Sequence, residues 1–118
     1  MKTICVMRDL YKALAQFEVG FEKVYGVSLN EAMVLCSLNE AQDKMTSSAI
    51  AERTEMSPSH TSKVISNIED KAYVRRSLGK EDKRLMLFEL TPKGQERVDQ
   101  FVLDKVEIPT LIKPLFES

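Results

Sequence analysis

Apolar residues recur every three to four positions along the first part of the chain. They form one continuous stripe, which predicts an amphipathic helix over residues 3–25. Gly26 follows directly, as expected of a residue that ends a helix. A second apolar-rich segment begins at Ser28 and gives way to the polar stretch 39–43. The sequence therefore predicts two helices before residue 45.

Two shorter helices with clear N-terminal caps are predicted next. Residues 48–54 follow Thr46 and Ser47, and either hydroxyl can serve as the cap. Ser57 precedes a proline, which suits the first position of a helix because its missing amide costs nothing there. The helix that starts here is predicted to span residues 58–71. Its outer face carries short polar groups, one imidazole and one lysine: Ser59, His60, Ser62, Lys63, Ser66 and Asn67.

The pattern then becomes typical of β-strands. Residues 73–78 and 85–90 are rich in apolar and β-branched or aromatic side chains, and the charged segment 79–84 lies between them. Since the intervening segment opens with glycine, the three segments predict a β-hairpin with an extended tip.

A fifth helix is predicted to begin at Thr91, where a capping side chain and a proline again stand together. Pro109 and Pro114 limit any later helix to about residues 110–116. The apolar positions assigned to the fifth helix are Val98, Phe101, Val102 and Val106.

This order of elements predicts a mainly α fold that contains a winged helix-turn-helix with a two-stranded β wing. Residues 1–118 are expected to form a single domain, with the winged helix over about 28–92 and flanking helices over about 3–25 and 92–117. The major groove of B-DNA admits one α-helix, and base edges are recognised by hydrogen-bonding side chains of the kind found on the outer face of the helix over 58–71.

The charge distribution supports this interpretation, although the net charge of the 118 residues is −1. Residues 57–97 hold nine basic and six acidic side chains, whereas the segments on either side each carry a net charge of −2. The basic excess thus coincides with the predicted winged helix, where phosphate contacts would be made. The acidic flanks suit another role, such as dimerisation.

Several other classes of protein are excluded by what the sequence lacks. No apolar run of about 18 residues predicts a membrane span, and the start does not resemble a signal peptide, so a cytoplasmic protein is expected. His60 is the only histidine and no ligands are grouped at metal spacing, so neither a metal nor a cofactor is expected. An enzyme is disfavoured because no phosphate-binding glycine loop or paired nucleophile and base is present.

Cys5 and Cys36 are the two cysteines, and they do not form a CxxC pair. The simplest interpretation is two free, mostly buried thiols in a reducing compartment. Redox sensing by Cys5 is the alternative, because this residue lies near a terminus.

Five segments together resemble the MarR family of bacterial regulators, over roughly residues 28–98. They are AIAE (49–52), MSPS (56–59), VISNIEDKAYVRR (64–76), DKR (82–84) and LTPKG (90–94). Each segment is weak evidence alone, whereas the combination is fairly specific. Ala72 stands where the family usually has glycine.

The resemblance implies a homodimeric transcriptional regulator, expected to be a repressor, that binds a pseudo-palindromic site on double-stranded DNA. Arg84 would enter the minor groove at the wing tip, and Lys83 beside it and Arg76 at the start of the wing would also bind DNA. Asp82 would pair with an arginine to hold the wing. The residues expected to face the major groove are Pro58, Ser59, His60, Ser62, Lys63 and Ser66.

Two alternatives remain open at this point. A winged helix that binds protein instead of DNA is compatible with the near-neutral charge. The resemblance also suggests a small aromatic effector, for which Tyr11, Phe17 and Tyr25 are candidate contacts, but aromatic residues at helical spacing more often belong to a core.

Overall fold

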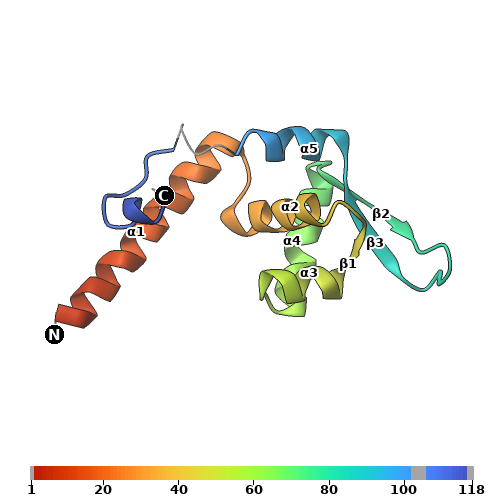
Figure 1. The fold of residues 1–118 in the computed structure, drawn as a ribbon, viewed down its shortest axis with the longest axis horizontal. Helices are drawn as coiled ribbons and strands as arrows, with labels where there is room; N and C mark the ends of the chain where they lie inside the picture. Colours follow the sequence, from red (N-terminus) through yellow and green to blue (C-terminus); the bar gives the residue numbers. More distant parts are fainter. Residues whose placement is uncertain (1, 102–105, 117–118) are drawn as a thin grey trace. The chain divides into compact units, whose positions relative to one another are not determined.

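The computed structural model describes residues 2–101 and 106–116. The chain divides into two compact units, one from the described parts of segments 1–29 and 102–118, and one from residues 30–101. Figure 1 shows the elements of both. The fold is mainly helical, as predicted, and no helix among the described residues is long and apolar enough to cross a membrane.

The first unit contains the helix α1 (Lys2–Tyr25) and a short 3-10 helix, η1 (Lys113–Phe116). The side chains of Phe17, Phe21 and Tyr25 are buried in a row along α1, with centroids of successive rings 6.0 and 4.8 Å apart. Gly26 ends the helix in the left-handed conformation (φ 74°), as its position in the sequence predicted. Core formation is thus the role that the structure gives to Phe17 and Tyr25.

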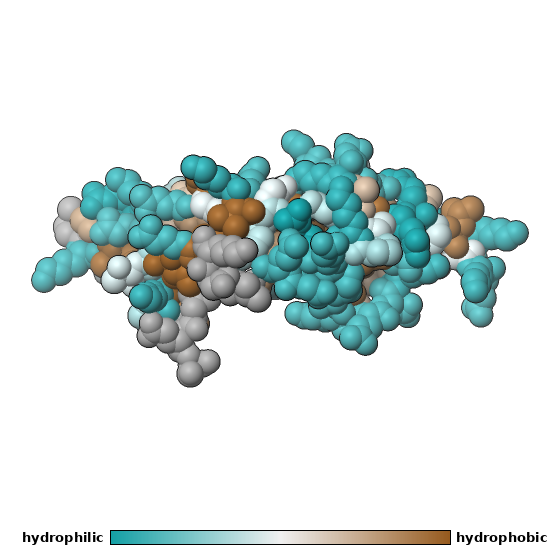
Figure 2. All heavy atoms as spheres, turned by 90° about the horizontal axis from the view of Figure 1, so that it is seen from above, coloured by the Kyte–Doolittle hydropathy of each residue, from teal (hydrophilic) through white to brown (hydrophobic). Residues whose placement is uncertain are grey.

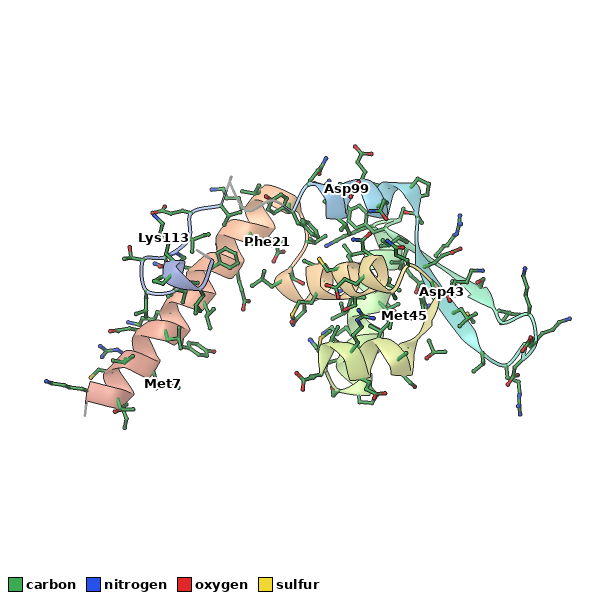
Figure 3. The ribbon with its side chains drawn as sticks, in the orientation of Figure 1. Met7, Phe21, Asp43, Met45, Asp99 and Lys113 are labelled. Atoms are coloured by element: carbon green, nitrogen blue, oxygen red, sulfur yellow. The ribbon has the colours of Figure 1, made fainter. Side chains whose placement is uncertain are left out.

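The N-terminal half of α1 leaves its apolar side chains exposed. Ile4, Met7 and Tyr11 are 70%, 59% and 78% exposed, and they continue the helical spacing of the buried rings. Figure 3 labels Met7 on this half of the helix, and Figure 2 shows hydrophobic surface on the unit. The single stripe seen in the sequence is therefore partly core and partly surface. Cys5 is exposed here, so the expectation of a mostly buried thiol is wrong for this residue.

The second unit begins with three helices: α2 (Leu29–Ala41), α3 (Ser47–Thr54) and α4 (Pro58–Asp70). Their inner faces supply a compact core, in which Leu35, Ile50 and Ile68 are almost completely buried. The Thr46 hydroxyl accepts a hydrogen bond from the amide of Ala49 at 3.1 Å, so threonine and not Ser47 caps α3.

A three-stranded antiparallel sheet follows, with β1 (Met45–Thr46), β2 (Val74–Leu78) and β3 (Met86–Leu90) in the order β1-β3-β2. The predicted hairpin of β2 and β3 is confirmed, but the prediction of a two-stranded sheet omitted β1. Two residues carry no detectable alternation, and β1 exists because Met45 and Thr46 pair with Phe88 and Leu87, some forty residues later. This non-local pairing fixes the start of α3 against the base of the wing.

The turn from α4 into β2 passes through Ala72, which adopts the left-handed conformation with φ 65°. The amide of Tyr73 donates to the carbonyl of Ile68 at 2.9 Å, and the amide of Ala72 donates to Glu69 at 2.9 Å. These bonds satisfy carbonyl groups at the end of α4 in the manner typical of a glycine-terminated helix. Ala72 therefore adopts a left-handed conformation that glycine takes more readily than alanine.

The helix α5 (Pro92–Asp99) packs on this turn. The Thr91 hydroxyl accepts from the amide of Gly94 and donates to the carbonyl of Ala72 at 2.6 Å, while the Thr91 amide donates to Tyr73 at 3.0 Å. The fifth helix is shorter than predicted: it ends at Asp99, and Gln100 is its C-cap. Phe101 lies beyond it, Val106 lies in a bend, and Val102 falls outside the described residues.

Candidate nucleic-acid interface

The helix α4 separates a buried face from a polar face. Thr61, Val64, Ile65 and Ile68 pack into the unit, whereas all six residues predicted to face the major groove are exposed. The Ser57 hydroxyl accepts from the amide of His60 at 3.2 Å, so the N-terminal cap is confirmed. One rigid element thus presents hydroxyls, an imidazole and an ammonium group toward solvent, as a helix that reads base edges must.

His60 has a hydrogen-bond partner that the sequence did not indicate. The side-chain amide nitrogen of Asn30, on α2, lies 3.0 Å from Nε2 of His60. If the amide donates, Nε2 accepts and the imidazole proton sits on Nδ1, where it can be donated to another acceptor. Because these residues are 30 positions apart, no local pattern could have identified Asn30.

The wing tip carries an ordered pair formed by Asp82 and Arg84. The Asp82 carboxylate accepts from the Arg84 backbone amide at 3.0 Å and from its guanidinium at 3.0 and 3.2 Å. These hydrogen bonds lower the pKa of Asp82. The Arg84 side chain is nevertheless 91% exposed, so the pair orients a cation that still projects from the hairpin. Figure 3 shows long side chains extending outward from this tip.

Arg76 is in a different environment, although the resemblance grouped it with the DNA contacts. Its Nε donates to Oε2 of Glu69 at 2.7 Å and its Nη2 donates to the other carboxylate oxygen. The guanidinium also lies over the ring of Phe88, 5.4 Å from the centroid. The hydrogen bond from Arg76 lowers the pKa of Glu69 and raises that of Arg76. This arrangement binds the strand β2 to the last turn of α4.

Three other basic side chains of the second unit also have acidic partners. Arg53 pairs with Glu40, Lys71 with Glu31 and Arg75 with Glu89, all at 2.8–3.0 Å. In contrast, the exposed lysines on the outer face of α4 and at the wing tip have no acidic side chain within ion-pair distance in the described part of the chain. These are Lys63, Lys80 and Lys83.

Lys44 adds a further cation beside the wing, which sequence reasoning missed. Its ammonium group lies 3.4 Å from the hydroxyl of Ser77 on β2, and it lines a hollow of about 500 Å³ together with Leu78, Lys80 and Leu85. Lys44 precedes β1, so its position at the wing depends on the strand that the sequence pattern did not reveal.

Neither cysteine takes part in this surface. Burial, and to a lesser degree the charge of Glu40, raises the pKa of the half-buried Cys36 thiol. A raised pKa keeps the thiol protonated and unreactive near neutral pH. Among the described residues there is also no group of three His, Cys, Asp or Glu side chains that could hold a metal ion.

Comparison with known proteins agrees with this geometry. The sequence model of the MarR family matches residues 25–85, which is more than half of the chain. The chain belongs to the MarR family. MarR proteins are DNA-binding transcriptional regulators and not enzymes, so both of these expectations are confirmed at the level of the family.

Solved structures of MarR-family proteins share the fold. YusO from Bacillus subtilis is 26% identical with a TM-score of 0.67, covering 82% of this chain and 67% of YusO. A MepR-like protein complexed with pseudoligands is 22% identical, with a TM-score of 0.74 and coverage of 83% and 68%. A MepR variant from S. aureus bound to an oligodeoxyribonucleotide is 19% identical, with a TM-score of 0.65 and coverage of 84% and 72%. No curated protein matches the sequence.

Proposed function

We propose that this chain is a sequence-specific regulator that binds double-stranded DNA as a homodimer and represses transcription. The observation that carries the proposal is the placement of exposed cations on the outer face of α4 and at the wing tip: Lys63, Lys80 and Lys83 have no acidic partner among the described residues, and Arg84 is 91% exposed although it pairs with Asp82. Phosphate neutralisation by such groups supplies most of the affinity of a protein for DNA. Repression follows if the bound dimer blocks access to an overlapping promoter.

The proposed contacts divide between two grooves. Lys83 and Arg84 enter the minor groove at the wing tip, where narrow A·T-rich segments attract cations. Two copies would read half-sites about one helical turn apart, on one face of a pseudo-palindromic operator in the cytoplasm. The residues proposed for the major groove are Pro58, Ser59, His60, Ser62, Lys63 and Ser66.

A small molecule is proposed as the effector, because a structural neighbour is complexed with pseudoligands. Of the three aromatic residues that the sequence offered for such a site, Phe17 and Tyr25 are in the core and Tyr11 is exposed. Of these three side chains, only Tyr11 is therefore accessible in the single chain.

The test is DNA binding after selection of bound duplexes from a random pool. Replacing Arg84 with Ala is expected to weaken binding about tenfold and to reduce the slope of log affinity against log salt, because a cation is lost from the interface. Lys93→Ala is the matched control, since it removes one positive charge from α5, where the ammonium lies over Tyr73. Fluorescence anisotropy at several salt concentrations measures both effects.

Two outcomes contradict the proposal. If no duplex is bound at low salt, the protein is better described as a winged helix that binds protein. If Arg84→Ala and Lys93→Ala have equal effects, the wing tip does not contact DNA.

A further inference from the structure

The Arg76 clamp, formed by Glu69, Arg76 and Phe88, joins three elements of the winged helix. Glu69 lies in the last turn of α4, Arg76 in the middle of β2, and Phe88 directly opposite Arg76 on β3. Two nitrogens of the guanidinium bond to the two carboxylate oxygens, and its face covers the Phe88 ring. Bidentate pairing and stacking both fix the orientation of a guanidinium, which a single ion pair does not.

The clamp spans the connection between the recognition helix and the wing. That connection is the turn through Ala72, which adopts a conformation that alanine rarely takes. The side chains of Glu69 and Arg76 bridge this turn from either side. They therefore restrain the angle between α4 and the hairpin, independently of the backbone hydrogen bonds.

Arg75 provides a contrast at the neighbouring position. Its Nε donates to the carboxylate of Glu89 at 2.8 Å, and Arg75 and Glu89 are directly opposite each other in the β2–β3 register. This pair joins the two strands of the hairpin to each other and has no member on α4. The two adjacent arginines thus carry the same charge, but Arg75 joins β2 to β3 whereas Arg76 joins β2 to α4.

We infer that Arg76 is a positioning residue, which sets the angle of the wing through Glu69 and does not itself contact DNA. This inference rests on the proposed function. A helix in the major groove and a wing in the adjacent minor groove bind together only when the angle between them is correct, and the second contact then benefits from a high effective concentration. Loss of the clamp lowers affinity because the wing no longer stays in that orientation.

Whether Glu69→Gln raises or lowers the affinity for DNA separates this inference from a direct contact between Arg76 and DNA. If Glu69 merely competes with phosphate for Arg76, Glu69→Gln frees the arginine and removes a negative charge, so DNA affinity rises. If Glu69 holds the clamp, the same substitution lowers affinity, by about fivefold for a lost charge-assisted hydrogen bond. Glu89→Gln is the control, since it removes the same charge from the Arg75 pair and is expected to leave affinity unchanged or slightly higher.

Arg76→Lys gives a second, independent test. Lysine keeps the positive charge and can still reach a phosphate, but it cannot pair bidentately with a carboxylate. The inference predicts that Arg76→Lys binds about fivefold more weakly, with the same salt slope as the wild type, because no phosphate contact has been lost. Wild-type affinity in Arg76→Lys, or tighter binding by Glu69→Gln, would overturn the inference.

Nuclear magnetic resonance of the free protein separates failure of the inference from failure of the proposed function. Residual dipolar couplings measure the angle between α4 and the wing, and relaxation measures the mobility of the backbone amides of residues 79–85. In Glu69→Gln the angle should change and the mobility should increase, whereas Glu89→Gln should alter neither. If the wild type binds no duplex but Glu69→Gln changes the wing angle, the DNA-binding proposal is refuted and the role inferred for the clamp stands. An unchanged wing in Glu69→Gln would refute the clamp.

Discussion

Ala72 shows how one residue can carry strain within an otherwise ordinary winged helix. It has φ 65°, a conformation in which the Cβ of an L-residue approaches the following carbonyl oxygen. The turn is held there by the hydrogen bonds of Ala72 and Tyr73 to the end of α4 and by Thr91, which donates to the Ala72 carbonyl. Packing around the residue therefore overrides its own conformational preference.

Replacing Ala72 with Gly is expected to stabilise the protein by about 1 kcal/mol, since glycine adopts positive φ without a steric penalty. Urea denaturation followed by circular dichroism measures the change. Ala49→Gly is the matched control, because Ala49 is in the helix α3, where glycine should destabilise by about 1 kcal/mol. A loss of stability in Ala72→Gly would show that the turn does not store the strain inferred for it.

The residue scale also shows where the sequence stops being informative. The caps of α3, α4 and α5 could be predicted because they depend on neighbouring residues. The pairs Asn30–His60 and Glu69–Arg76 could not, because each forms only after separate elements have packed. Most of the proposed contact surface was therefore predictable, whereas the interactions that orient it were not.

Among the elements, α5 depends most on close contact with the backbone of its neighbour. A Cβ at position 94 would collide with the carbonyl oxygen of Tyr73 and lie 2.9 Å from the carbonyl carbon. The glycine of the LTPKG segment is thus explained by space. It lets the first turn of α5 lie against the exit from α4, where the amide and hydroxyl of Thr91 make hydrogen bonds to Ala72, Tyr73 and Gly94.

Gly94→Ala is accordingly expected to destabilise the fold by about 2 kcal/mol, the usual cost of an overpacked contact. Gly20→Ala is the control, because its new Cβ would meet Val106 at an ordinary 3.5 Å and α1 would gain helix propensity. Thermal unfolding of the two variants should therefore shift in opposite directions. Equal shifts would mean that α5 can move away from Tyr73 at little cost.

From α1 to the start of α5, the predicted boundaries of the helices and of β2 and β3 lie within one or two residues of those observed. The last helix, predicted over about residues 110–116, is a 3-10 helix over Lys113–Phe116. Two other misses have physical causes. The strand β1 has two residues and is defined by its partner β3, and α5 ends at Asp99 although apolar residues continue at its spacing. Periodicity indicates which face a helix could bury, but it does not show whether the chain finds a surface to bury it against.

At the scale of the whole molecule, the two units differ in the kind of side chain that they expose. The winged-helix unit has cations without acidic partners, which suits a polyanion. The first unit exposes Ile4, Met7 and Tyr11 along one face of α1, and exposed apolar stripes of this kind typically mark a protein–protein contact. The charge distribution is consistent with this division, because the basic excess is confined to residues 57–97.

The proposed homodimer should therefore depend on the exposed half of α1. Tyr11→Asp places a charge within the stripe, and burying it would weaken dimerisation at least about tenfold. Lys12→Asp introduces the same side chain at the adjacent exposed position, off the stripe, and should leave the dimer intact. Sedimentation velocity at micromolar concentration distinguishes the two.

Since a monomer can hold only one half-site, Tyr11→Asp should also lose DNA affinity although its winged helix is unchanged. A monomeric wild type would contradict the homodimer, and a dimeric Tyr11→Asp would move the interface away from this face of α1.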